Sequence, residues 1–108
     1  MAHYLVGFAT IHDASKLPEY IARVHEIIAK YGGEPVREGP VTHILEGSLE
    51  VGGKAPDNGV IIRFPDEESA LGMYNSPEYV ELRKFRSDME TAVIALVGEF
   101  QDPTTGSS

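Results

Sequence analysis

The side chains best suited to bind a ligand are tyrosines and arginines near turns and helix ends. Arg86 follows Tyr79 in an amphipathic segment, and a guanidinium there could hold a carboxylate through two parallel hydrogen bonds. Tyr74 and Tyr79 flank a Ser-Pro turn, and each carries a polar hydroxyl on an apolar ring. Tyr20 lies on the apolar stripe of an earlier helical segment. We expect these residues to line a ligand site, with core packing and a salt bridge as the alternative roles.

Charged residues on or beside the expected strands form a second candidate group. Arg37, Arg63 and Glu46 would make a small polar site if their side chains pointed into the cleft of a dimer. Otherwise they would form an ion pair at an interface or stay in water. His43 lies close to Glu46 in the sequence, and a neutral imidazole on that strand could act as a general base. His43 and Glu46 are therefore the candidates for catalysis and Arg37 and Arg63 further candidates for ligand binding, and the sequence leaves open whether the protein is an enzyme.

Several common enzyme chemistries lack their residues in this sequence. It contains no Cys, so there is no thiol nucleophile and no disulfide frame, and no Gly-x-Ser-x-Gly elbow occurs. The four histidines do not show the spacing of a zinc site, and no residue is marked as a haem ligand. We expect neither a metal nor a cofactor.

Composition is typical of a globular protein and disfavours several kinds of partner. The 108 residues suffice for one domain, and hydrophobic residues make up 42% of them. Nine basic against seventeen acidic residues give a formal net charge of -8, which opposes binding to nucleic acid or to anionic membranes. No apolar run approaches the ~20 residues of a membrane span, and the N-terminus lacks a basic leader. Together with the lack of Cys, these features favour the cytoplasm.

Hydrophobic periodicity predicts which elements position these side chains. Apolar and β-branched residues from 3 to 11 indicate a strand, after which the apolar period becomes that of a helix from Leu17 to Tyr31. Gly32-Gly33 ends this helix. Asp66 and Ser76 are typical N-caps of two later helical pieces. The remaining elements are a strand at 34–47 that is broken or bulged at Gly39-Pro40, a turn-rich connection at 48–58, a strand at 59–64 and a strand at 92–100.

The element order β-α-β-β-α-β predicts an α+β, ferredoxin-like fold, with a four-stranded antiparallel sheet and its helices on one face. Both faces of the first strand are apolar, with Val6 and Phe8 on one and Leu5 and Ile11 on the other. A monomer rarely leaves such a patch in water. We therefore expect a homodimer whose two sheets stack into a dimeric α/β barrel. A single domain over residues 1–101 would be followed by a disordered tail at 102–108.

Several motifs resemble those of a known family. They are Leu45-Glu46-Gly47, Phe64-Pro65-Asp66, Ser69-Ala70, Tyr74-Asn75-Ser76-Pro77-Glu78-Tyr79 and Arg86, in this order and spacing. With Tyr20, Tyr31-Gly32-Gly33 and Arg37-Glu38-Gly39 they cover nearly the whole chain, and the sequence is similar to the domain-of-unknown-function family DUF1330. His43 departs from the family, which more often has an aliphatic residue at that place.

The resemblance implies the dimeric α/β-barrel superfamily but no established activity. Relatives by fold include cofactor-free monooxygenases, haem-dependent enzymes and stress-responsive proteins, and kinship of fold alone does not define a function. Two hypotheses therefore stay open. Either the protein binds or converts a small polar or carboxylate metabolite in a cleft near the sheet, or it is a non-catalytic ligand-binding or structural dimerisation module.

Overall fold

The computed structural model of the protein describes residues 1–100. Its elements follow the predicted order, with the second helical region divided in two. The predicted tail at 102–108 and the domain boundary after residue 101 lie outside the described residues. In chain order the elements are β1 (His3–Ile11), the short 3-10 helix η1 (Ala14–Lys16), α1 (Leu17–Lys30), β2 (Glu34–Pro40), β3 (Asn58–Phe64), α2 (Glu67–Tyr74), α3 (Pro77–Ser87) and β4 (Glu90–Val97).

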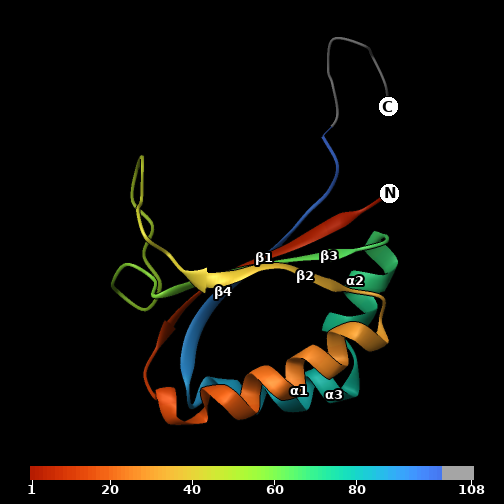
Figure 1. The fold of residues 1–108 in the computed structure, drawn as a ribbon, viewed down its shortest axis with the longest axis horizontal. Coiled ribbons are helices and arrows are strands. Elements are labelled where there is room, and N and C mark those ends of the chain that lie inside the picture. The colour runs from red at the N-terminus through yellow and green to blue at the C-terminus, as the bar shows by residue number, and fades with distance from the viewer. Residues whose placement is uncertain (101–108) are drawn as a thin grey trace.

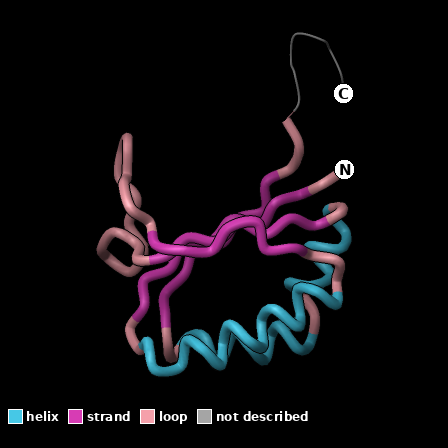
Figure 2. Tube along the Cα trace, viewed as in Figure 1, coloured by secondary structure: helices cyan, strands magenta, loops and turns pink. Residues whose placement is uncertain are grey.

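The four strands form one antiparallel sheet in the order β2-β3-β1-β4. All three α-helices lie on the same side of this sheet, so the molecule has one helical layer and one sheet layer (Figure 1). The tube view shows the same two layers, with the sheet in magenta above the helices in cyan (Figure 2). The predicted ferredoxin-like fold is confirmed. We call the sheet face that meets the helices the inner face and the other the open face.

The helix α1 ends where the sequence predicts, and a glycine is required there. Gly32 has a φ of 79°, a conformation that only glycine adopts without strain. The next residue, Gly33, donates its N–H to the carbonyl of Ile28 at 2.9 Å. A Cβ on Gly33 would lie 2.7 Å from side-chain carbons of both Ile28 and Phe64. This turn therefore brings the backbone into close contact with Ile28 and Phe64 before it enters β2.

The hydrophobic core lies between the helices and the inner face. Alternation along β3 places Ile62 and Phe64 inward, while Ile61 and Arg63 lie on the open face. The helices contribute the other wall through apolar residues at helical spacing. The buried residues of this core are Leu5, Val24, Ile28, Ile62, Phe64, Ala70, Met73, Tyr79 and Leu82.

The predicted strand at 34–47 is wrong in its second half. In the structure β2 ends at Pro40, which pairs with Asn58, the first residue of β3. Beyond this pair, residues 1–100 offer no further strand for residues 41–47 to join, although their composition suits a strand. The register shift also lies between Pro35 and Arg37, and not at Gly39-Pro40. The last strand differs less, because β4 runs from Glu90 to Val97 where we predicted 92–100.

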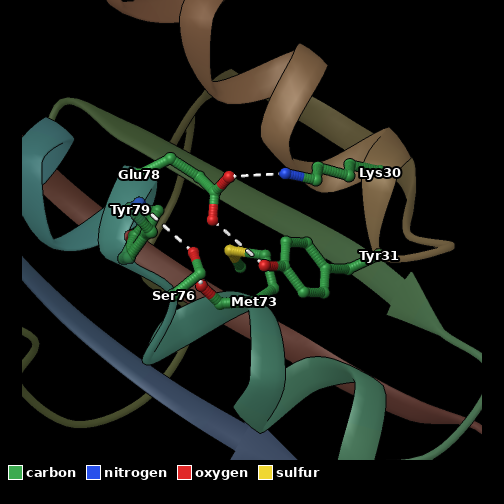
Figure 3. A network of polar contacts seen from close by, with 6 residues as sticks. All are labelled: Lys30, Tyr31, Met73, Ser76, Glu78 and Tyr79. Atoms are coloured by element: carbon green, nitrogen blue, oxygen red, sulfur yellow. Dashed lines mark hydrogen bonds and ion pairs between the residues drawn. The ribbon is translucent and has the colours of Figure 1, made fainter.

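The start of α3 is fixed by one cap and one carboxylate, which also joins it to α1 (Figure 3). Ser76 caps α3 by accepting from the backbone N–H of Tyr79 at 3.2 Å, as predicted. Glu78, in the first turn of α3, accepts from Lys30 Nζ at 2.7 Å and from the Tyr31 hydroxyl at 3.0 Å. These hydrogen bonds lower the pKa of Glu78 to about 2. The start of α3 is thereby attached to the end of α1.

The Glu78 contacts predict a specific loss of stability in acid. Because the pKa of Glu78 falls from 4.5 to about 2 on folding, its stabilising contribution is complete above pH 4.5 and disappears as the pH falls towards 2. Glu78→Gln should therefore flatten the pH dependence of the unfolding free energy across this interval. Urea unfolding followed by circular dichroism at several acidic pH values measures it. Glu81→Gln, which removes an exposed carboxylate from the same helix, is the control and should keep the wild-type slope. An unchanged slope in Glu78→Gln would contradict the assignment.

Candidate functional site

A cleft of about 350 Å³ lies between the inner face of the sheet and the helical layer. Its walls are mainly apolar and come from β1, β3 and β4 on one side and from α1 on the other. The side chains that form these walls include Leu5, Val24, Ile28, Ile62 and Ile94. Apolar walls enclose the body of a ligand without selecting its charge, so selection depends on the few polar groups in the cleft.

The polar end of the cleft is formed by Tyr20, Tyr79, Arg86 and Glu90. Tyr79 and Arg86 are seven residues apart on α3, about two helical turns, so they lie on one face of that helix. The Arg86 Nη1 donates a hydrogen bond to the Tyr79 hydroxyl at 2.9 Å. Tyr20 comes from α1 and Glu90 is the first residue of β4. Three elements therefore converge on one guanidinium.

Burial perturbs the ionisation of all four groups. It raises the pKa of Tyr20 and of Tyr79, although the charge of Arg86 partly opposes the effect for both. It also raises the pKa of Glu90, again against the attraction of Arg86. For Arg86 burial alone would lower the pKa, but the neighbouring Tyr79, Tyr20 and Glu90 outweigh it and the pKa is raised. Arg86 is thus a cation, while the tyrosines beside it are held neutral.

This arrangement leaves a positive charge in a mostly apolar cleft. The ion pairs among residues 1–100 do not include Arg86. A guanidinium has five N–H donors, and Tyr79 accepts from one of them. The remaining donors and the two tyrosine hydroxyls could bind an anion that enters the cleft.

Tyr74 lies beside this site but does not line the cleft. Its ring packs against that of Tyr79, with centroids 5.3 Å apart and an angle of 43° between the planes. The guanidinium of Arg83 lies 4.5 Å from the Tyr74 ring centroid. Tyr74 instead borders a smaller hollow between α2 and the strands β1 and β4, next to Leu71 and Leu96. Its role in the structure is to pack against Tyr79.

The two strand arginines lie on the open face, away from the cleft. Arg63 pairs in register with Tyr4 on one side and with Glu34 on the other. Arg37 pairs with Ile61, because the register shift before it turns its side chain to the same face. The sheet therefore separates Arg37 and Arg63 from Arg86.

His43 and Glu46 are exposed in the connection between β2 and β3 and do not line the cleft. We expected His43 on a strand of the sheet, and this is wrong because β2 ends at Pro40. Within residues 1–100, the hydrogen bond of the His43 side chain is with the Thr42 hydroxyl, at 3.3 Å. Of the predicted residues, the structure brings together Tyr20, Tyr79 and Arg86 only.

Two acidic residues that line the cleft, Glu90 and Glu38, were not among the predicted site residues. Glu90 follows Arg86 by four residues, a spacing that could have suggested proximity, but we placed it before the last strand. Glu38 lines the cleft from β2, and its carboxylate meets His25 Nε2 of α1 at 2.9 Å. This contact joins β2 to α1 across the layers, which no local sequence pattern indicates.

The described residues contain neither a metal-binding cluster nor a membrane-spanning helix. Within residues 1–100, no group of three or more His, Asp or Glu side chains is arranged to hold a metal ion. No helix in this part of the chain is long and apolar enough to cross a membrane.

The environment of Tyr20 predicts a loss of stability in alkali. Its pKa is raised above the ordinary value of 10.0, so the neutral hydroxyl stabilises the fold fully below pH 10.0 and this contribution is lost as the pH rises further. Tyr20→Phe has no hydroxyl to ionise and should lose stability less steeply above pH 10.0. Denaturant unfolding on both sides of this pH measures the difference. Tyr4→Phe, on the open face, is the matched control. A Tyr20→Phe profile as steep as that of the wild type would count against a buried hydroxyl.

Comparisons with known proteins agree with this fold. No curated protein matches the sequence. A protein of unknown function from Rhodopseudomonas palustris has a similar structure, with a TM-score of 0.72 at 15% identity, over 94% of this chain and 84% of that chain. A dimeric ferredoxin-like protein of unknown function from Jannaschia sp. CCS1 gives 0.69 at 10% identity, over 92% and 100%. SnoaB, a cofactor-independent oxygenase from Streptomyces nogalater, gives 0.65 at 17% identity, over 94% and 95%.

These identities are low enough that the structural likenesses show the fold alone. The sequence itself matches the model of a family described as a domain of unknown function, DUF1330, over residues 2–100. This match confirms the resemblance found in the motifs around Tyr74–Tyr79 and Arg86. The chain belongs to the DUF1330 family.

Proposed function

We propose that the cleft binds a small organic carboxylate, held at its charged end by Arg86 and enclosed elsewhere by apolar side chains. The observation that supports this most directly is the Arg86 guanidinium, which lies in an apolar cleft beside the hydroxyls of Tyr79 and Tyr20 and takes part in none of the ion pairs among residues 1–100. A buried charge is costly unless it is paired. A carboxylate in the cleft would supply the missing partner through two charge-assisted hydrogen bonds.

The size and polarity of the cleft favour a particular class of ligand. At about 350 Å³ it lies near the lower end of the ~300–1,000 Å³ usual for ligand sites. The apolar walls suit an aromatic ring or a branched aliphatic chain. Glu90 would disfavour a second negative charge close to Arg86, since its own ionised form would repel it. The preferred ligand is therefore a monocarboxylate with an apolar body.

Binding fits the site better than catalysis does. Raised pKa values make Tyr20 and Tyr79 poor proton donors, but they leave both hydroxyls as neutral hydrogen-bonding groups. The candidates for catalysis, His43 and Glu46, lie outside the cleft. SnoaB is named a cofactor-independent oxygenase, yet its likeness to this chain is one of fold. Neither predicted catalytic residue is therefore placed to act on a ligand bound in the cleft.

Carboxylate binding should depend on the charge and on Arg86. Benzoate and branched aliphatic monocarboxylates should raise the melting temperature and give measurable heats in calorimetric titration, while the uncharged benzamide should not. Arg86→Gln should weaken binding by about tenfold or more, because a hydrogen bond to a charged group contributes ~1.5–3 kcal/mol.

Arg23→Gln is the control for this experiment, since it removes the same charge from the exposed side of α1. Affinity should be unchanged in this variant. Equal losses in both variants would indicate a general effect of net charge. Wild-type affinity in Arg86→Gln would exclude Arg86 as the carboxylate partner.

The open face supports assembly of two copies. Ile61, Val93 and Val97 on this face are between 37% and 53% exposed. A contiguous apolar surface of this kind usually meets a partner, and a second sheet of the same shape provides a self-complementary one. The Jannaschia relative is described as dimeric. The side chains that cover the face, judged from strand register, are Tyr4, Val6, Phe8, Ile61, Val93, Ala95 and Val97.

Light scattering should give the mass of two chains at micromolar concentration. Val93→Lys places a charge on the open face and should raise the dimer dissociation constant at least ~10-fold, because two copies of the change meet in one symmetric interface. Leu71→Lys is the control, as Leu71 is 45% exposed but lies on α2 in the helical layer. A wild-type protein that stays monomeric at all concentrations, or equal effects of both variants, would contradict assembly through the open face.

A further inference from the structure

The connection between β2 and β3 contains an arm that projects from the molecule. We define the arm as residues 42–50, which have no helix or strand. Figure 1 shows this yellow loop rising from one end of the sheet on the side opposite the helices. The tube view shows the same projection as a narrow pink loop (Figure 2). The arm therefore stands beside the open face and above its level.

The base of the arm is attached to the sheet at both ends. Before the arm, the Val41 N–H donates to the carbonyl of Asp57 at 3.0 Å. After it, Val51 is 1% exposed, and its carbonyl accepts from the hydroxyl of Thr10 at 2.6 Å. The Asp57 carboxylate also accepts from the Ile11 N–H at 2.8 Å. These contacts fix where the arm leaves the sheet, so little ordering is needed before it can meet a partner.

The arm carries two apolar side chains that its own chain leaves partly or almost fully uncovered. Leu45 is 90% exposed, the highest value among the large apolar side chains of residues 1–100. Ile44 beside it is 39% exposed. A single exposed leucine needs no explanation, but an apolar pair held on a projecting loop beside an apolar sheet face does.

We propose that the arm of each chain packs against the second copy of a dimer, with Leu45 buried in this contact. This inference rests on the proposed dimer. The reason is steric. Because the arm rises on the open side of the sheet, a second sheet stacked on the open face has to lie alongside the arm. By symmetry both arms take part, so the interface extends beyond the sheet faces and includes two copies of Ile44 and Leu45.

Charge supports a second copy of this chain as the occupant. The open face carries Arg37 and Arg63, whereas Glu46 follows Leu45 on the arm. The ion pairs among residues 1–100 include none of these three side chains. Two chains of formal charge -8 repel each other, so a local match between an acidic arm and basic residues of the other copy would favour this orientation. The arm's apolar tip and acidic flank are thus complementary to the face beside which it stands.

The first test compares two exposed leucines, one on the arm and one in the helical layer, in the full chain. Leu45→Ser should raise the dimer dissociation constant at least ~10-fold, since each dimer loses two buried leucine side chains. Leu71→Ser, in the helical layer, should leave it unchanged. Analytical ultracentrifugation measures both, and circular dichroism checks that both variants fold. A dimer that dissociates equally in the two variants, or in neither, would overturn the role of the arm.

The second test locates the arm directly and uses the absence of Cys in the chain. Ser48→Cys carries a nitroxide label on the exposed arm and is mixed with isotope-labelled chain that lacks the nitroxide. The expected result is broadening of amide resonances at the open face and at the arm base of the copy that lacks the nitroxide. Broadening that is absent in a proven dimer would overturn the arm contact alone. A monomer would overturn both the arm contact and the dimer, while carboxylate binding in the cleft would be unaffected.

Discussion

The structure depends on one imbalance: a sheet has two faces, and the helices of this chain cover only one of them. The helical layer buries Leu5, Ile62 and Phe64 on the inner face. On the open face, Ile61, Val93 and Val97 stay partly in water. The same strands therefore require two different environments, one within the chain and one outside it. The proposed ligand site and the proposed assembly each concern one of these two faces.

On the inner face, the helices pack over the sheet without filling the space at one end. The contact of Glu78 with Lys30 and Tyr31 holds the start of α3 against the end of α1. Where the layers leave the cleft, Arg86 is supported by Tyr79 from its own helix. Placing a charge in such a cleft is unfavourable for stability alone. The charge of Arg86 would be stabilised if the cleft bound an anion.

The fold and part of the site could be predicted from the sequence. The features that could be predicted depend on neighbouring residues, and those that could not depend on residues far apart in the chain. Strand alternation, the helical stripe before Gly32 and the caps Asp66 and Ser76 are encoded within a few residues, and all were confirmed. The predicted position of His43 was wrong. The end of β2 depends on where β3 begins, and this register joins residues far apart in the chain. Tyr79 and Arg86 could be grouped because helical spacing places them on one face.

Other parts of the site follow from packing alone. The register shift between Pro35 and Arg37 turns Arg37 to the open face, and no pattern in the sequence locates a shift of one residue. Glu90 enters the cleft only because β4 starts opposite Ile11. Such long-range pairings decide which charged side chains lie close together. Of the predicted arginines, Arg37 and Arg63 therefore lie on the open face and Arg86 lies in the cleft on the inner side.

The central claim is that Arg86 receives a carboxylate in the cleft, and nuclear magnetic resonance of the arginine Nε–H groups tests it most directly. Titration with benzoate should shift the Arg86 Nε–H signal in a saturable way, together with the methyl signals of Ile28 and Ile62, and leave those of Arg37 and Arg63 in place. Shifts confined to Arg37 and Arg63, or no saturable shift at Arg86 with any monocarboxylate, would contradict the account.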